Sequence, residues 1–150
     1  TGLSIIGAVA LADGASEARA DILSLFVDEY ALSPGEMPGC EDPRVLGQVR
    51  HRFHIQAARV HHMPELKLDS VERVRHVEDV PGYKVSRPTM INRRYCQGHA
   101  RLNDGKHPTV YYLIEQRAGF VGASWNVEFC LAGYDPWRVH DGHCRTLRPW

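Results

Sequence analysis

The chain has no excess of charge of either sign. Lysine and arginine together number 18 among its 150 residues, and aspartate and glutamate also number 18, so the formal net charge is zero. A neutral chain produces no overall field that would draw in a polyanion, and we therefore expect no nucleic-acid partner. Any partner has to be recognised by local chemistry.

The chain also lacks an apolar run long enough to cross a bilayer, so no permanent membrane span is expected. Residues 3–12 form a continuous apolar and small stretch, about half of the roughly 20 residues that a spanning helix needs. Ala18, Arg19 and Ala20 follow in the small, any, small pattern that signal peptidase accepts. We expect an export leader over residues 1–20 and one mature domain over residues 21–150. The alternative is an N-terminal core helix.

Paired cysteines at the two-residue spacing of zinc sites and thioredoxin-like proteins are missing. The four cysteines, Cys40, Cys96, Cys130 and Cys144, are widely separated and even in number. Such a set is typical of disulfides, which form outside the reducing cytosol. We therefore expect a protein exported from the cytosol, with disulfides that each stabilise it by about 2 to 4 kcal/mol.

One segment has a clear helical pattern. Asp42 and Pro43 give an N-cap followed by proline at the first helical position, and Pro64 cannot continue a helix. We expect a helix from residue 43 to about residue 62. Its apolar residues share one face, and they are Val45, Leu46, Val49, Phe53, Ala57 and Val60. Apolar spacing predicts a shorter helix over residues 22–30.

The C-terminal half has the alternation of strands. In residues 91–102 the apolar or small set is Cys96, Gly98, Ala100 and Leu102, and in residues 124–131 it is Trp125, Val127, Phe129 and Leu131. Residues 109–116 are rich in β-branched and aromatic side chains. Turns are expected at Asn103, Asp104 and Gly105 and at Gly119 and Gly122. Valines at a period of three in residues 66–80 fit neither helix nor strand well, and we assign this segment to a strand.

These elements predict an α+β domain. Three consecutive strands with short connections make an antiparallel β-meander, and its apolar face needs a cover, for which the helix after Pro43 is available. We expect one main helix packed on a curved sheet, with a layout analogous to cystatin-like and nuclear-transport-factor-like folds.

The strand order bears on the disulfides. Four cysteines allow three pairings, and sequence alone does not decide among them. If the strands pair in order, a third strand separates Cys96 from Cys130 by roughly 10 Å, which is too far for a bond. This favours Cys130 with Cys144 and, by elimination, Cys40 with Cys96.

The C-terminal part of the chain resembles a set of small exported bacterial proteins without assigned function. The resemblance rests on Arg94, Tyr95, Cys96, Asn103, Asp104, Gly105, Val110, Tyr111, Tyr112, Trp125, Asn126, Val127, Glu128, Phe129, Cys130, Asp135, Pro136, Trp137, Asp141, Gly142 and Cys144. It implies a periplasmic or secreted location and no particular activity, and it supports the cysteines as framework residues.

Histidines gather on the polar face of the predicted main helix. They are His51, His54, His61 and His62. Only His51 and His54 are close enough in the helix to share a metal ion. Because no cysteine or carboxylate at a fixed spacing completes such a site, we expect a solvated face, with no bound metal and no cofactor.

A second cluster of polar and aromatic residues lies near the C-terminus. It consists of Asp135, Trp137, His140, Asp141 and His143. A histidine beside carboxylates can act as a general base, but Asp135 with Pro136, and Asp141 with Gly142, are also typical of turns. We expect structural turns, with Trp137 covering the end of the sheet. If the cluster instead binds a partner, the candidate residues are Trp125, Trp137, His140, Asp141 and His143. A pocket joining His140 or His143 to Glu128 would favour catalysis.

No catalytic residue is assigned. Glu115 and Glu128, on neighbouring strands, could form a glycoside hydrolase pair, but nothing fixes their separation, and Glu115 is expected to face solvent. Phosphate-binding loops and nucleophile elbows are missing from the sequence. We therefore expect a non-enzymatic exported module that binds another protein or envelope component, as an accessory part of an envelope complex. The alternatives are a small-molecule-binding or enzymatic domain with a cavity between helix and sheet, and a periplasmic metal-binding protein.

Overall fold

The computed structural model describes residues 37–81, 91–116 and 124–149. These residues all belong to one compact unit, residues 32–150. The predicted leader over residues 1–20, the predicted helix over residues 22–30 and the turn at Gly119 and Gly122 lie outside the described residues.

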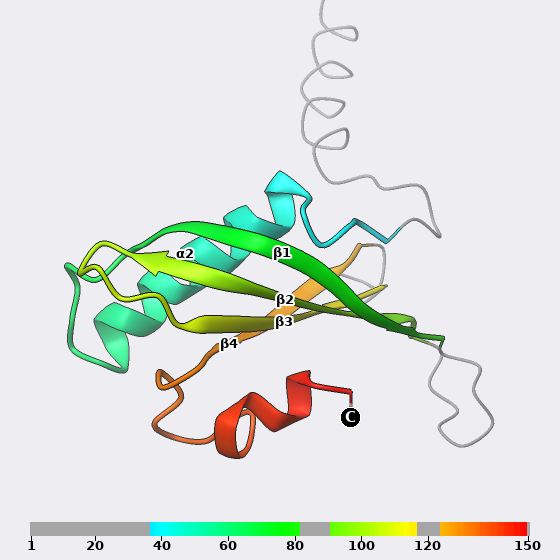
Figure 1. Cartoon of the computed structure of the whole chain (residues 1–150). Coiled ribbons are helices and arrows are strands. Elements are labelled where there is room, and N and C mark those ends of the chain that lie inside the picture. The colour runs from blue at the N-terminus through cyan, green and yellow to red at the C-terminus, as the bar shows by residue number, and fades with distance from the viewer. Residues whose placement is uncertain (1–36, 82–90, 117–123, 150) are drawn as a thin grey trace, which may run out of the picture. The chain divides into compact units, whose positions relative to one another are not determined.

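An antiparallel sheet with one main helix makes up the domain. The elements are α2 (Pro43–Arg59), β1 (Leu68–Val80), β2 (Arg93–Leu102), β3 (Thr109–Glu115), β4 (Asn126–Leu131) and a 3-10 segment, η2 (Gly142–Leu147). The strands pair in sequence order, β1-β2-β3-β4, and every neighbouring pair is antiparallel (Figure 1). The predicted α+β class and the meander are confirmed, and the segment with the period of three forms the first strand.

Helix α2 begins where the sequence predicts. The Asp42 carboxylate accepts a hydrogen bond from the backbone N–H of Arg44 at 2.9 Å, and Pro43 occupies the first helical position. The helix ends at Arg59, three residues before the predicted end. Val60 and His61 both donate to the carbonyl of Gln56, and His62 then adopts a left-handed backbone with φ of 56°. The chain therefore leaves the helical path before Pro64 acts on it.

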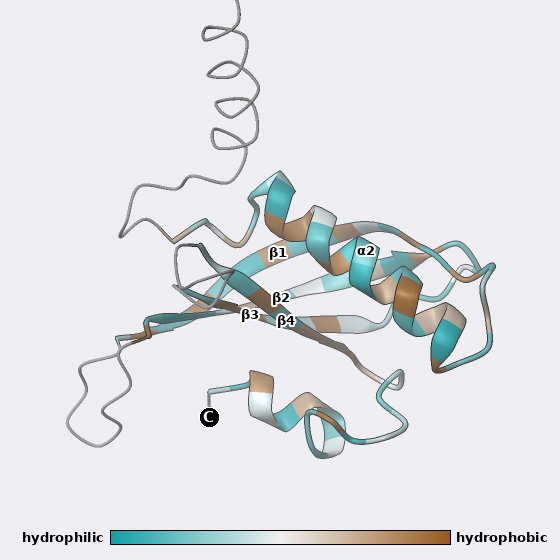
Figure 2. Ribbon diagram, turned by 180° about the vertical axis from the view of Figure 1, so that it is seen from behind, coloured by the Kyte–Doolittle hydropathy of each residue, from teal (hydrophilic) through white to brown (hydrophobic). Residues whose placement is uncertain are grey.

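Alternate residues of the strands pack into two clusters, one on each face of the sheet. On one face, strand residues pack against Val45, Val49, Phe53 and Ala57 of α2, all of them fully buried; the strand members include Cys96, Ala100, Leu102, Val110, Tyr112, Ile114, Val127 and Leu131. On the other face, Leu113 and Cys130 pack with residues of η2. Helix α2 and η2 therefore lie on opposite sides of the sheet (Figures 1 and 2).

Strand β1 contains three β-bulges, and the central one explains the spacing of three between Val71 and Val74. Its 13 residues pair with only 10 in β2, and the register shifts by one residue at three places. At the central bulge, Arg73 has a left-handed φ of 49°, and Val71 and Val74 both pack against the cluster under α2. An extra residue in a strand reverses the facing of those that come after it, so a spacing of three keeps both valines on one face.

The position opposite the central bulge requires glycine, because β1 approaches the β2 backbone closely there. Gly98 of β2 is buried, and a β-carbon added to it would lie 2.7 Å from Cγ1 of Val71 and 3.2 Å from the carbonyl oxygen of Glu72. Any larger residue would therefore displace β1.

Two disulfides fix the ends of the domain to the sheet. Cys40 is bonded to Cys96 of β2, and Cys130 of β4 is bonded to Cys144 of η2. This is the pairing favoured by the strand order, and it is confirmed. The first bond ties the segment before α2 to the sheet, and the second ties η2 to the opposite face.

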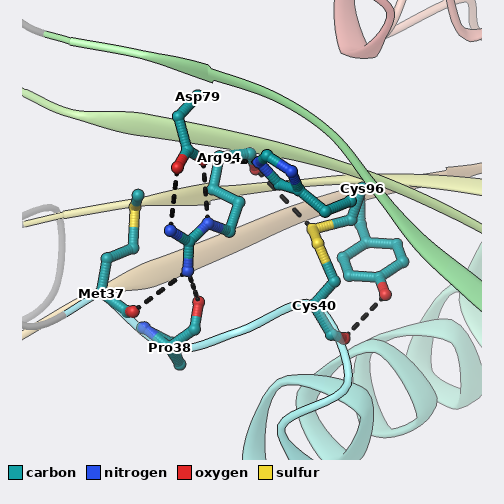
Figure 3. Close-up of a disulfide and its surroundings, with 8 residues drawn as sticks. Met37, Pro38, Cys40, Asp79, Arg94 and Cys96 are labelled. Atoms are coloured by element: carbon teal, nitrogen blue, oxygen red, sulfur yellow. Dashed lines mark hydrogen bonds and ion pairs between the residues drawn. A yellow bond between two sulfur atoms is a disulfide. The ribbon is translucent and has the colours of Figure 1, made fainter.

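Polar contacts reinforce the first disulfide (Figure 3). The Arg94 guanidinium donates to both carboxylate oxygens of Asp79 at 2.9 Å and to the carbonyl oxygens of Met37 and Pro38 at 3.3 and 2.9 Å. The buried Tyr112 hydroxyl donates to the carbonyl of Cys40 at 2.8 Å. Burial raises the pKa of Tyr112, so this hydroxyl keeps its proton and remains a donor at neutral pH.

Candidate functional site

The C-terminal cluster forms a loop whose aspartates hold the backbone in place. The two carboxylate oxygens of Asp135 accept from the backbone N–H groups of Val139 and His140, both at 2.9 Å. Asp141 accepts from the N–H of Gly142 at 2.7 Å and pairs with Arg145. The Gly142 N–H and then the Arg145 guanidinium hold the pKa of Asp141 below its usual range. Both carboxylates are engaged in turns, as the sequence predicts, and Asp141 is a poor proton acceptor at neutral pH.

Two large apolar side chains project from this loop. Trp137 is 71% exposed and Val139 is 69% exposed. They stand at the edge of a pocket of about 210 Å³ whose other lining residues include Gln56 and Val60 of α2, Phe129 of β4, Pro136 and His140. We call this set the Trp137 surface. It is an apolar hollow between the end of α2, β4 and the loop.

Contacts from α2 fix the base of the loop. The Gln56 side-chain amide donates to the carbonyl of Tyr134 at 2.7 Å, and the His61 ring nitrogen lies 3.2 Å from the same oxygen. The Tyr134 ring meets the rings of Phe53 and His61 edge to face, at 5.8 and 5.5 Å between centroids. Together with the Cys130–Cys144 bond, these contacts hold the loop from both ends.

The loop histidines divide between two hollows. His140 lines the Trp137 surface, and its Nδ1 lies 3.4 Å from the Thr146 hydroxyl. His143 lines a second hollow of about 350 Å³, with Arg138 and Asp141 also in its wall. Glu128 is exposed and lines neither hollow. Neither of these two hollows therefore joins a loop histidine to Glu128, which is the arrangement that would favour catalysis.

Two expectations about individual residues are wrong: Trp137 is 71% exposed and does not cover the end of the sheet, and Glu115 does not face solvent. Trp125, a candidate binding residue, is only 6% exposed and belongs to the core under α2. It follows the same alternation as Val127, which already indicated a buried position. Glu115, expected to face solvent, has a side chain only 15% exposed, because it pairs at 2.8 Å with Arg93, its cross-strand neighbour. The partner on β2 draws this carboxylate onto the sheet.

The helix histidines do not converge on one point. His51, His54 and His62 are exposed, whereas His61 contacts Tyr134. Within residues 37–81, 91–116 and 124–149, no group of three or more histidine, cysteine, aspartate or glutamate side chains is placed to hold a metal ion. The described residues thus give the metal-binding hypothesis no site.

Sequence reasoning found the loop but missed part of its surroundings. Trp137 and His140 were predicted and do line the pocket, whereas Val139, Gln56 and Phe129 were not predicted as site residues. The signal for Val139 is its place two residues after Trp137 in a polar turn, where an apolar side chain has no core to enter. No signal in the sequence indicated Gln56, because its role depends on a hydrogen bond to Tyr134, which is distant in the chain.

Comparisons with known protein families, with curated proteins and with solved structures find no match to this chain. In the part of the chain that the structure describes, no helix is both long and apolar enough to cross a membrane. The interpretation of the Trp137 surface therefore rests on its own geometry.

Proposed function

We propose that the chain is an exported, non-enzymatic module that binds another protein through the Trp137 surface, as an accessory part of a bacterial envelope complex. The observation that carries this proposal is the exposure of Trp137 and Val139 beside an apolar pocket, on a loop fixed at both ends. The occupant would be an apolar side chain of the partner, inserted between Trp137 and Phe129.

The energetics favour a protein contact. Burying a large apolar side chain contributes about 1.5 to 3 kcal/mol, and the exposed Trp137 and Val139 have not realised that contribution within the described fold. Tryptophan is enriched among the residues that dominate binding energy at protein interfaces. A loop already ordered by Asp135 and by the Cys130–Cys144 bond loses little further entropy on binding.

The packing between helix and sheet gives the small-molecule alternative less support. Phe53, Tyr112 and Ile114 of this layer are fully buried with no accessible surface. A cavity large enough for water beside these side chains would leave them accessible surface. No cavity therefore lies beside these three side chains, and the hollow that α2 and β4 do line is the one at the Trp137 surface.

Two finer features belong to the same proposal. Two disulfides support a periplasmic or secreted location, because such bonds persist in oxidising compartments. We also propose that the sheet curves around α2 in the manner of cystatin-like and nuclear-transport-factor-like folds. The three bulges of β1 support this, since bulges bend a strand.

Site-specific photo-cross-linking in the native cells tests the binding function. A photoreactive residue at position 137 is expected to give one discrete cross-linked adduct, whose partner is identified by mass spectrometry, purified and titrated against the chain. The double variant W137S/V139S should weaken that binding by at least roughly tenfold, because two apolar anchors are lost. Met63→Ser is the matched control, since Met63 is an exposed apolar residue outside the pocket lining.

The outcome against the proposal is equally definite. It fails if gentle co-purification and cross-linking recover only free monomer. It also fails if W137S/V139S binds the identified partner as tightly as the Met63→Ser control. Unfolding midpoints of both variants, measured alongside, should match that of the original chain, because all three side chains are exposed.

A further inference from the structure

The solvent face of α2 is a concentrated patch of basic residues in a neutral chain. Residues 43–64 contain four arginines and four histidines and no aspartate or glutamate, although the chain as a whole has 18 residues of each charge. Arg50, His51, His54 and Arg59 of α2, and His62 just beyond its end, are exposed. At about 100° per residue, Arg50 and Arg59 lie on opposite edges of the exposed arc of the helix, with His51 and His54 between them. We call these five residues the basic face. Figure 2 shows α2 in front of the sheet, with hydrophilic residues over much of its ribbon.

Within the described residues, the two arginines of the basic face differ from the other two arginines of α2. Arg44 is paired with Asp42 at 2.7 Å, and Arg52 donates to Asn126 and to the carbonyl of Val127 at the edge of β4. In contrast, the guanidinium groups of Arg50 and Arg59 make no hydrogen bond or ion pair with any residue in the described ranges. Their charges are available to a partner.

We propose that the basic face binds an acidic stretch of polypeptide on the partner protein that the Trp137 surface anchors. This inference rests on the proposed function. The two surfaces adjoin, because Gln56 and Val60 of α2 line the pocket and Arg59 directly precedes Val60. The basic face then guides and orients the partner, while the Trp137 surface supplies the apolar anchor.

The surrounding chemistry favours an acidic protein over a membrane or a nucleic acid. The apolar face of α2 is buried against the sheet, so it cannot enter a lipid bilayer as an amphipathic surface helix does. Outside residues 43–64, the described ranges carry 12 acidic and 10 basic residues, so an extended polyanion would gain no further attraction beyond the helix. A local acidic segment meets the basic face alone.

Binding of poly-L-glutamate to the purified chain, measured by titration calorimetry at low and at physiological ionic strength, tests the inference. We expect salt-sensitive binding that the variant R50E/R59E weakens by roughly tenfold or more, since two attractive charges become repulsive. The milder variant R50Q/R59Q should show a smaller loss in the same direction. The matched control is K67E/R73E, which changes the net charge equally at two exposed positions of the chain outside α2.

The results separate this inference from the binding function itself. W137S/V139S should bind poly-L-glutamate as the original chain does, because the apolar anchor takes no part in that binding. The poly-L-glutamate test therefore remains valid even if the Trp137 surface proves to bind no protein. The inference is overturned if K67E/R73E weakens binding as much as R50E/R59E, or if no binding occurs at low ionic strength. Tighter binding to a DNA duplex, or to vesicles containing phosphatidylglycerol, than to poly-L-glutamate would also overturn it.

Discussion

Substitution of Gly98 by alanine tests the bulge that positions β1 against β2. An added β-carbon would lie 2.7 Å from Cγ1 of Val71, 3.2 Å from the carbonyl oxygen of Glu72 and 3.5 Å from Cγ2 of Val74. Carbon atoms pack at about 3.5 to 4.0 Å, so the first contact is too close by roughly an ångström. One neighbour is backbone and cannot rotate away, so β1 itself has to shift.

The size of the effect depends on two opposing contributions. Overpacking a filled core costs about 1 to 3 kcal/mol, and replacing glycine in a strand recovers about 0.5 to 1 kcal/mol by restricting the unfolded chain. We expect Gly98→Ala to lower the free energy of unfolding by about 1 to 2 kcal/mol. Gly47→Ala is the control, because nothing lies within 4 Å of its added β-carbon, and this helix substitution should stabilise by about 0.5 to 1 kcal/mol.

The assay is urea unfolding with the disulfides intact, followed by far-ultraviolet circular dichroism. Val71→Ala removes the methyl group that the new β-carbon meets, so V71A/G98A should lose less stability than the two single variants added together, by about 1 kcal/mol. The reasoning is refuted if Gly98→Ala is as stable as the original chain, or if the two substitutions are additive within error.

Two further predictions concern the ties at the ends of the domain. Replacing Cys40 and Cys96 by serine should lower the free energy of unfolding by about 4 kcal/mol, and replacing Cys130 and Cys144 should lower it by about 3 kcal/mol. The first bond closes a loop of 56 residues and the second a loop of 14, and the entropy of the unfolded chain that a bond removes rises with loop length. Equal losses in urea unfolding would contradict this order. The hydrogen bond from Arg94 holds the pKa of Asp79 below its usual range, so this carboxylate stabilises the fold fully above about pH 4 and its contribution is lost as the pH falls through the lowered value. Asp79→Asn should therefore reduce stability at neutral pH by under about 1 kcal/mol, a small effect because the Asp79 side chain is 44% exposed. The same variant should lose less stability than the original chain as the pH falls below about 4. An unchanged dependence of stability on acid pH would show that the ion pair contributes nothing.

Much of the fold could be predicted because local signals agree with one another. Asp42 and Pro43 mark the start of α2, and the alternation from Cys96 to Leu102 marks both β2 and its buried side. The strand order then restricted the disulfides by distance alone. These features depend on residues near one another in the chain.

The bulges of β1 could not be predicted, because they depend on a different strand. The central bulge fits only because Gly98, distant in sequence, has no side chain to obstruct Val71. Without that knowledge, the valine period matched neither helix nor strand. In the same way, the position of Glu115 depends on Arg93 across the sheet.

The candidate site was partly predictable for a related reason. The turn residues Asp135 and Asp141 act locally, and their roles could be inferred from the residues beside them. Trp125 belongs to the strand alternation that buries Val127, whereas Trp137 lies in the loop after β4 and is exposed. Composition treats the two tryptophans alike, and only their places relative to the strand separate them.

Non-reducing peptide mapping tests most directly whether disulfides hold this domain and its Trp137 loop in place. The protein is isolated from its native compartment, with thiols blocked at lysis. Fragments linked through Cys40 and Cys96, and through Cys130 and Cys144, are predicted, with no blocked thiol. Four blocked cysteines would contradict an exported, disulfide-held domain. A bond between Cys96 and Cys130 would contradict the strand order.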